Sequence, residues 1–156
     1  MAYACFREVL ATEMATNYPW LAQHSLVGLA MMDGTASVAG SARDQLVRAF
    51  ALDPHATMAI FSPLPSVVAA VAELVVESDA ERGALIWAMA AHLGHRTRYL
   101  PMYVQDVARI TAIVDRAREE HGIPVPDVAT DLTAADAIAQ CLEALAALDA
   151  TQAVTQ

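Results

Sequence analysis

Lysine is absent from this 156-residue chain, and arginine supplies all nine of its basic residues. Acidic residues number 18, so the formal net charge at pH 7 is -9. Nucleic-acid binding needs a basic face that neutralises phosphates, and this charge balance argues against it. An anionic membrane surface is disfavoured for the same reason. Arginine without lysine, beside abundant alanine, valine and leucine, is typical of GC-rich coding and indicates a bacterial source.

Cysteine is scarce as well. Cys5 and Cys141 are too few for a disulfide framework, and no CxxC spacing points to metal or redox chemistry. We expect both to be buried, reduced thiols. The first ten residues, MAYACFREVL, lack the basic stretch and the long apolar run of a signal peptide. These features together predict a cytoplasmic protein.

No hydrophobic run in the chain is suited to crossing a membrane. Residues 55–72 are uncharged when His55 is neutral, and their length comes close to the ~20 residues of a membrane span. Pro63 and Pro65 fall in the middle of this run, where they would interrupt helical hydrogen bonding. The sequence therefore predicts two short buried segments that meet at a proline turn, and no transmembrane segment.

What the chain does contain is apolar residues, 56% of the total, repeated at helical spacing. They predict an all-α fold: a compact single-domain bundle of about six to seven helices over residues 1–150, followed by a polar tail at 151–156. The expected helices cover about 3–16, 20–32, 41–52, 66–77, 79–93, 101–121 and the segment after 133, with a short one opening at Pro54. Residues 66–77 and 79–93 should be central. The valine pairs in 66–77 also suit a strand, and both assignments stay open.

Capping signals set the expected helix ends. Ser78 and Glu81 have the spacing of a capping box, with Ser78 as the N-cap of the 79–93 helix. Gly94 can close that helix as its C′ residue. The last helix should begin at a cap formed by Thr133 or Asp131.

The stretch GLAMMDGTASVAGSARDQLVRAF, residues 28–50, has an apolar helix that ends at Asp33-Gly34, a short loop, and a second helix. This arrangement resembles the first half of a TerB-like (tellurite-resistance-type) helical domain. Asp33, Gly34 and Ser37 match the loop of that family, whereas Gly40 stands where an acidic residue is expected. The resemblance implies an all-helical fold, and the departure at Gly40 leaves a metal-binding role unsupported.

Histidine and arginine gather near residue 94, in the sequence HLGHRTRYLP. On a continuous helix His92 and His95 would share a face and could ligate a metal or haem, although HExxH and paired ExxH signatures are missing. The interpretation we favour is that Gly94 ends the helix between them, so that His95, Arg96 and Arg98 are cations of the kind favoured at a helix C-terminus. A third alternative is a small basic patch of Arg96 and Arg98 beside Tyr99, which would dock an anion or an acidic partner.

A second cluster, NYPWLAQH at 17–24, brings together Tyr18, Trp20 and His24. Trp and Tyr are common anchors of binding interfaces, so Trp20 is a candidate binding residue. The alternative, which we favour, is a helix corner packed on the core. Methionines could line an adaptable apolar groove, although we expect most of them to fill the core, and the candidates are Met31, Met32, Met58, Met89 and Met102.

The sequence contains no GxGxxG, P-loop or GxSxG motif and no pair of carboxylates at catalytic spacing. No catalytic residue and no cofactor is predicted. The leading hypothesis is a non-catalytic accessory or assembly protein that acts through contacts with a protein partner or with itself as a homo-oligomer. The alternative is a small helical carrier of a metal, haem or other ligand that uses His92 and His95. A third hypothesis is a small helical enzyme whose substrate we cannot name.

Overall fold

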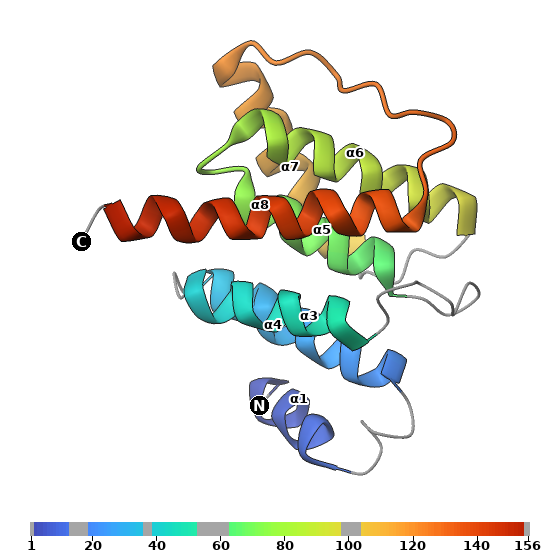
Figure 1. The fold of residues 1–156 in the computed structure, drawn as a ribbon, viewed down its shortest axis with the longest axis vertical. Coiled ribbons are helices and arrows are strands. Elements are labelled where there is room, and N and C mark those ends of the chain that lie inside the picture. Colours follow the sequence, from blue (N-terminus) through green and yellow to red (C-terminus); the bar gives the residue numbers. More distant parts are fainter. Residues whose placement is uncertain (1, 13–18, 36–38, 53–62, 98–103, 155–156) are drawn as a thin grey trace.

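The computed structural model describes residues 2–12, 19–35, 39–52, 63–97 and 104–154, which form seven helices and no strand. In chain order these are α1 (Ala2–Ala11), α3 (Pro19–Thr35), α4 (Ala39–Leu52), α5 (Leu64–Val75), α6 (Ala80–Thr97), α7 (Val104–His121) and α8 (Ala134–Val154) (Figure 1). The predicted all-α fold, with helices packed on one another, is confirmed. The short helix expected at Pro54 lies outside the described residues.

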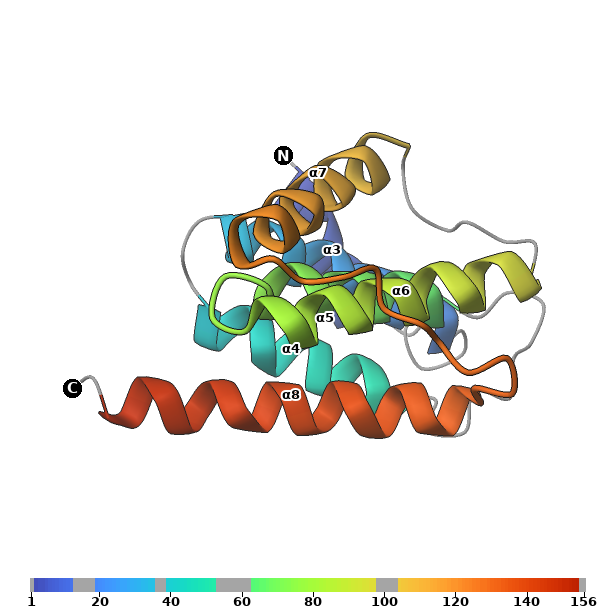
Figure 2. The ribbon, with the colours of Figure 1, turned by 90° about the horizontal axis from the view of Figure 1, so that it is seen from above.

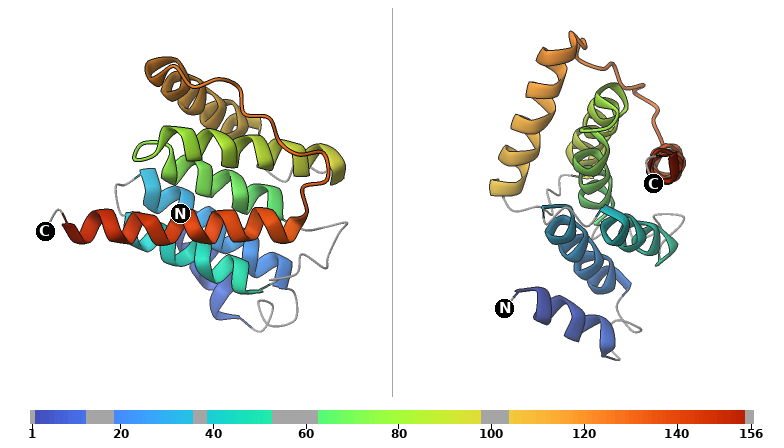
Figure 3. Two further views of the ribbon diagram at one scale, coloured as in Figure 1. Left: turned by 45° about the horizontal axis from the view of Figure 1, so that its top comes forward. Right: turned by 90° about the vertical axis from the view of Figure 1, so that its left-hand side faces the viewer.

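Helix α5 is at the centre of the arrangement. It contacts α3, α4, α6, α7 and α8. Figure 3 shows α7 and α8 on opposite sides of the α5–α6 hairpin, with α3 and α4 side by side below it. In Figure 2 the long helix α8 lies across one face of the molecule. Helix α1 is outermost, and α3 is its only contact among the described helices.

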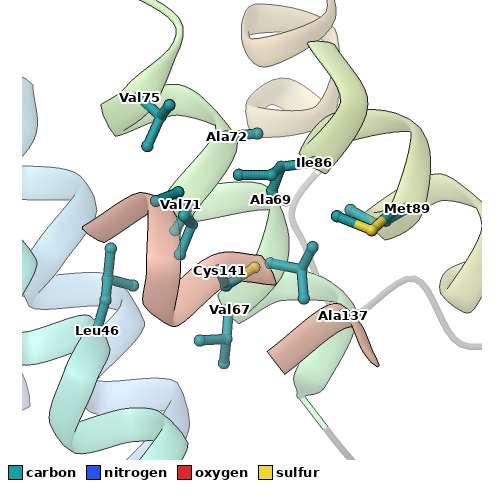
Figure 4. Close-up of a cluster of buried hydrophobic side chains, with 14 of the residues drawn as sticks. Leu46, Val67, Ala69, Val71, Ala72, Val75, Ile86, Met89, Ala137 and Cys141 are labelled. Atoms are coloured by element: carbon teal, nitrogen blue, oxygen red, sulfur yellow. The ribbon is translucent and has the colours of Figure 1, made fainter. Parts of the chain in front are cut away.

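The sequence of α5 explains its central place. Ten of its 12 residues are buried, so apolar side chains cover nearly every side of the helix and must be surrounded by other elements. The choice between helix and strand for this segment is settled in favour of helix. Its side chains meet residues of α4, α6 and α8 in one cluster, where Figure 4 labels Leu46, Val67, Val71, Val75, Ile86, Met89, Ala137 and Cys141.

Polar side chains tie the outer helices together. Gln23 Nε2 donates to the Ala49 carbonyl at 2.8 Å, and Ser41 Oγ donates to Asp33 Oδ2 at 2.6 Å, so two bonds join α3 to α4. Arg43 Nε reaches across to the Leu145 carbonyl of α8 at 3.2 Å. Asp33 is 7% exposed, and its carboxylate needs such a partner because an unpaired buried charge is costly.

Three predicted helix ends are wrong. Helix α3 does not end at Asp33-Gly34 but continues to Thr35. The cap of α6 is Asp79 rather than Ser78: Arg82 N donates to Asp79 Oδ1 at 3.0 Å, whereas Ser78 Oγ donates back to the Val75 carbonyl. Gly94 does not close α6, which runs on to Thr97. A buried glycine within a helix costs only about 0.5–1 kcal/mol relative to alanine, so packing overrides it.

The start of α8 follows the prediction for Thr133. Thr133 Oγ1 accepts a hydrogen bond from Asp136 N at 3.1 Å, and Asp136 Oδ2 accepts from Thr133 N at 3.0 Å. These reciprocal bonds are a capping box. At its other end α8 continues to Val154, inside the segment 151–156 that was expected to be a tail.

The two cysteines differ in burial. Cys141 is buried as expected, but Cys5 is exposed, which contradicts the prediction that both are buried. Cys5 lies on α1, a helix that contacts only one described neighbour and therefore keeps much of its surface in solvent. Among the residues that the structure describes, no helix has both the length and the apolar character needed to cross a bilayer.

Candidate functional site

A pocket of about 500 Å³ is lined by residues of α1, α3, α5 and α7. Most of its wall comes from one side of α3, namely Trp20, Leu21, His24, Val27, Met31 and Met32. Phe6 of α1, Ser66 of α5 and Asp106 of α7 complete the part of the wall that the structure describes. Ligand sites typically have this size and this make-up, with an apolar lining and a small number of polar groups.

Helix α3 can supply this wall because it is apolar on more than one side. Its buried residues, such as Leu26 and Leu29, face the bundle core. Val27 belongs to the same core and Met31 packs against it, and both also line the pocket. The pocket occupies the space between the α3 side chains that line it and the neighbouring helices. Helix α3 therefore both packs on the core and forms a wall of the pocket.

Gly28 allows α1 to approach α3 closely. A Cβ atom on Gly28 would lie 2.5 Å from Cε2 and Cζ of Phe6, far inside van der Waals contact. The absence of a side chain at this position therefore lets the Phe6 ring rest on the α3 backbone. In this way Gly28 sets the position of the α1 wall of the pocket.

Trp20 and His24 form the aromatic part of the lining. Their ring centroids are 6.1 Å apart and their planes are at 89°, an edge-to-face arrangement. Burial lowers the pKa of His24 from its ordinary value, so the imidazole is mainly neutral at pH 7. Trp20 is 37% exposed and lies at the solvent side of the pocket. The pair offers a ligand an aromatic surface without adding positive charge.

Ser66 is the polar residue at the α5 side of the pocket. It is 2% exposed, and its Oγ atom has no hydrogen-bond partner among the described residues. Its backbone N–H is bonded to the Pro63 carbonyl at 2.8 Å, at the first turn of the helix. An unpaired buried hydroxyl is destabilising, so Ser66 is a polar group of the wall whose hydrogen bonding the described residues leave unsatisfied.

Asp106 enters the pocket wall from the first turn of α7. Its Oδ1 is 3.5 Å from Nη2 of Arg109, one turn along the helix. The same guanidinium holds both carboxylate oxygens of Glu73 on α5 in a bidentate ion pair, with Nη2 to Oε2 at 3.1 Å. This pair joins α7 to α5 and fixes where Asp106 stands relative to the pocket.

The candidate binding residues near residue 94 differ in burial and in whether the structure describes them. His92 and His95 both lie on α6, which is continuous through them, so the interpretation of a helix end between them is wrong. His92 is partly buried and its Nε2 has no partner among the described residues, whereas His95 is exposed. Arg96 is in the last turn of α6, and its side chain is not described. Arg98 and Tyr99 lie outside the described residues.

The described part of the chain contains no group of three or more His, Cys, Asp or Glu residues placed to hold a metal ion. Metal or haem ligation by His92 and His95 stays a prediction that no further ligand in this part of the chain supports. Neither histidine lines the pocket on α3.

Part of the pocket lining coincides with the less favoured predictions from the sequence. Trp20 and His24 line the pocket, although a helix corner packed on the core is the interpretation favoured from the sequence, and Met31 and Met32 line it, although most methionines are expected to fill the core. Met89 is instead in the core, and Met58 and Met102 lie outside the described residues. Ser66 and Asp106 were missed, because nothing local marks one serine after two prolines, or one aspartate at a helix start, as part of a site that four helices assemble.

No protein-family model, no curated protein and no solved structure matches this chain. The resemblance to TerB-like domains accordingly remains a prediction.

Proposed function

We propose that the protein is a non-catalytic binding protein that holds a small, largely apolar molecule in the pocket of α1, α3, α5 and α7. The observation that supports this most directly is the combination of an apolar lining with one buried, unpaired hydroxyl. A well-packed core leaves few buried polar groups unpaired. Because the Ser66 hydroxyl is enclosed, a ligand would remove this cost where the pocket wall shifts enough to let a polar atom reach it. This is the carrier hypothesis, with the ligand at α3 and not at His92 and His95.

A ¹⁹F NMR screen of fluorinated aromatic fragments tests the proposal. Leu21 is half-buried and lines the pocket, so Leu21→Trp should reduce its volume and abolish binding. Leu85→Trp is the matched control, because Leu85 is a half-buried leucine of α6 that packs on the core. Circular dichroism should confirm that both variants fold. If no fragment binds, or if both variants lose binding equally, the proposal is wrong.

The accessory-protein hypothesis remains a second candidate, and the placement of α8 favours it. This helix extends beyond the rest of the molecule at its C-terminal end (Figures 1 and 2). Leu142 on its outer side is 38% exposed. Native mass spectrometry of the untagged protein from its own cells would test this function. A homo-oligomer or a second polypeptide would support it, and a monomer carrying only a small adduct would favour the carrier.

A further inference from the structure

We propose that the ligand of this pocket is a hydrophobic monocation, an aromatic or aliphatic body that carries one protonated amine, with the amine held at Asp106. This inference rests on the proposed function and adds the chemical class of the ligand. It follows from the charges around the pocket, the partners of Asp106 and the nature of the apolar wall.

The charges around the pocket disfavour an anion. Asp106 is the only acidic residue among the described lining residues, and His24, the one basic residue there, is mainly neutral at pH 7 because burial lowers its pKa. No arginine is among these lining residues, and the whole chain carries a formal charge of -9. A carboxylate or phosphate would be repelled at this site, whereas a cation would be attracted.

Asp106 is only partly neutralised by the protein itself. Arg109 is shared between two carboxylates, and the bidentate pair with Glu73 is the better of its two interactions. The contact with Asp106, at 3.5 Å, is at the limit of a hydrogen bond. One guanidinium and two carboxylates leave a local charge of about -1. The side chain of Asp106 is 29% exposed, so an incoming ammonium can reach it.

The rest of the wall suits the body of such a ligand. Phe6, Val27 and Met31 offer apolar contact, and methionine side chains adapt to the shape of what they bind. Trp20 presents a partly exposed indole on which an ammonium or an aromatic ring can stack. A pocket of about 500 Å³ is large enough for a molecule of one or two rings.

Three probes with one carbon skeleton test the inference: 1-naphthylmethylamine, 1-naphthylmethanol and 1-naphthoate, titrated calorimetrically at pH 7. The cationic amine should bind about tenfold more tightly than the neutral alcohol, and the anionic naphthoate should bind most weakly. Asp106→Asn should weaken amine binding about five- to tenfold and leave alcohol binding unchanged.

Asp115→Asn is the matched control. Asp115 lies on the same helix and pairs with Arg118 at the same i,i+3 spacing, with 3.1 Å between Oδ1 and Nη1, but it does not line the pocket. This variant should bind all three probes as the unmodified protein does. Circular dichroism spectra of both variants should match that of the unmodified protein.

The outcomes separate the two proposals. If the alcohol or the naphthoate binds as tightly as the amine, the monocation hypothesis is wrong, and titration of the Leu21→Trp variant then decides whether the binding is in the pocket. If Asp106→Asn and Asp115→Asn weaken the amine equally, attraction to the acidic surface explains the preference and the role of Asp106 is wrong. If none of the three probes binds, the hypothesis of a monocationic ligand is wrong. The ¹⁹F NMR fragment screen alone then decides whether the pocket binds a small molecule.

Discussion

At the scale of single residues, the two cysteines occupy opposite environments. Cys5 is exposed on α1, whereas Cys141 is fully buried in the cluster around α5 (Figure 4). Burial raises the pKa of Cys141 to about 12, because a thiolate is poorly solvated among apolar side chains. Since the thiolate is the reactive form of cysteine, the two residues should differ sharply in chemical reactivity.

We therefore expect iodoacetamide at pH 8 to modify one cysteine per native chain. At this pH a thiol with a pKa of about 12 is ionised in only about one molecule in ten thousand, and the packing around Cys141 also blocks access. Mass spectrometry should show one adduct in buffer and two in guanidinium chloride. The Cys5→Ser variant should take up none while folded. Rapid native modification of Cys141 would contradict the buried position.

Gly28 gives a second prediction at this scale. Alanine is intrinsically better than glycine in a helix by up to about 1 kcal/mol, but a Cβ here would collide with the Phe6 ring. Overpacking of this kind costs about 1–3 kcal/mol, so Gly28→Ala should be destabilising by about 1 kcal/mol in urea unfolding.

The sign should reverse once the ring is removed. In a Phe6→Ala background, Gly28→Ala should stabilise the protein by about 0.5–1 kcal/mol, because only the helix propensity is left. If Gly28→Ala changes the free energy of unfolding equally in both backgrounds, Phe6 does not rest on Gly28, and Phe6 does not form the α1 wall of the pocket.

At the scale of helices, the capping box of α8 makes stability depend on pH. Hydrogen bonds from the Thr133 side chain and backbone lower the pKa of Asp136 below its usual range. The folded state therefore favours the ionised carboxylate. The resulting stabilisation is present above the pKa of the unfolded chain, about 3.9, and disappears as the pH falls through the lower folded pKa.

Asp136→Asn should accordingly lower the melting temperature at pH 7, and the difference from the unmodified protein should shrink below about pH 4. Thermal unfolding followed by circular dichroism at pH 7 and pH 3 measures this. In a Thr133→Val background, which lacks the hydroxyl donor, the pH dependence should be weaker. A difference that is constant between the two pH values would show that the capping box does not control this carboxylate.

The helices themselves were largely predictable from the sequence, but their ends were less so. The apolar repeat located α5 and α6, because a core-facing stripe is a property of the segment alone. The cap at Asp79 could not be chosen over Ser78, since both residue types cap helices and the α5–α6 turn decides between them. Gly94 was expected to stop α6, but it is buried, and packing within the bundle keeps the helix intact.

The residues of the candidate site were even less predictable from the sequence than the helix ends. Trp20 and His24 are four residues apart on one helix, so the sequence could show them as a cluster. Ser66 and Asp106 join them only because α5 and α7 pack as they do, and the Arg109–Glu73 ion pair that places α7 is itself a contact between distant segments. Local patterns reveal which faces are apolar, but not which polar residues the bundle will bring to one place.

At the scale of the whole molecule, the helices are unequally held. Helix α5 is enclosed by five neighbours, whereas α1 contacts only α3 among the described helices. Local opening is easiest where few buried contacts hold an element. In hydrogen exchange, the amides of α5 should open only with global unfolding, and those of α1 should exchange fastest among the described helices.

The difference in local stability between α5 and α1 bears on the proposed function. Because Phe6 of α1 is part of the pocket wall, a bound molecule touches both the least stable helix and the α3 surface under it. A ligand that binds only while α1 is folded onto α3 should stabilise this folded state by mass action. Saturating 1-naphthylmethylamine should therefore slow hydrogen exchange in α1. Exchange in α8, which lies on the far side of the α5–α6 hairpin from α7, should change little beyond any global effect (Figure 3). Phe6→Ala is the control, since α1 then contributes no ring to the ligand and its protection should not increase. If exchange slows equally in α1 and α8 of the unmodified protein, the ligand stabilises the molecule as a whole, and α1 is not part of its binding site.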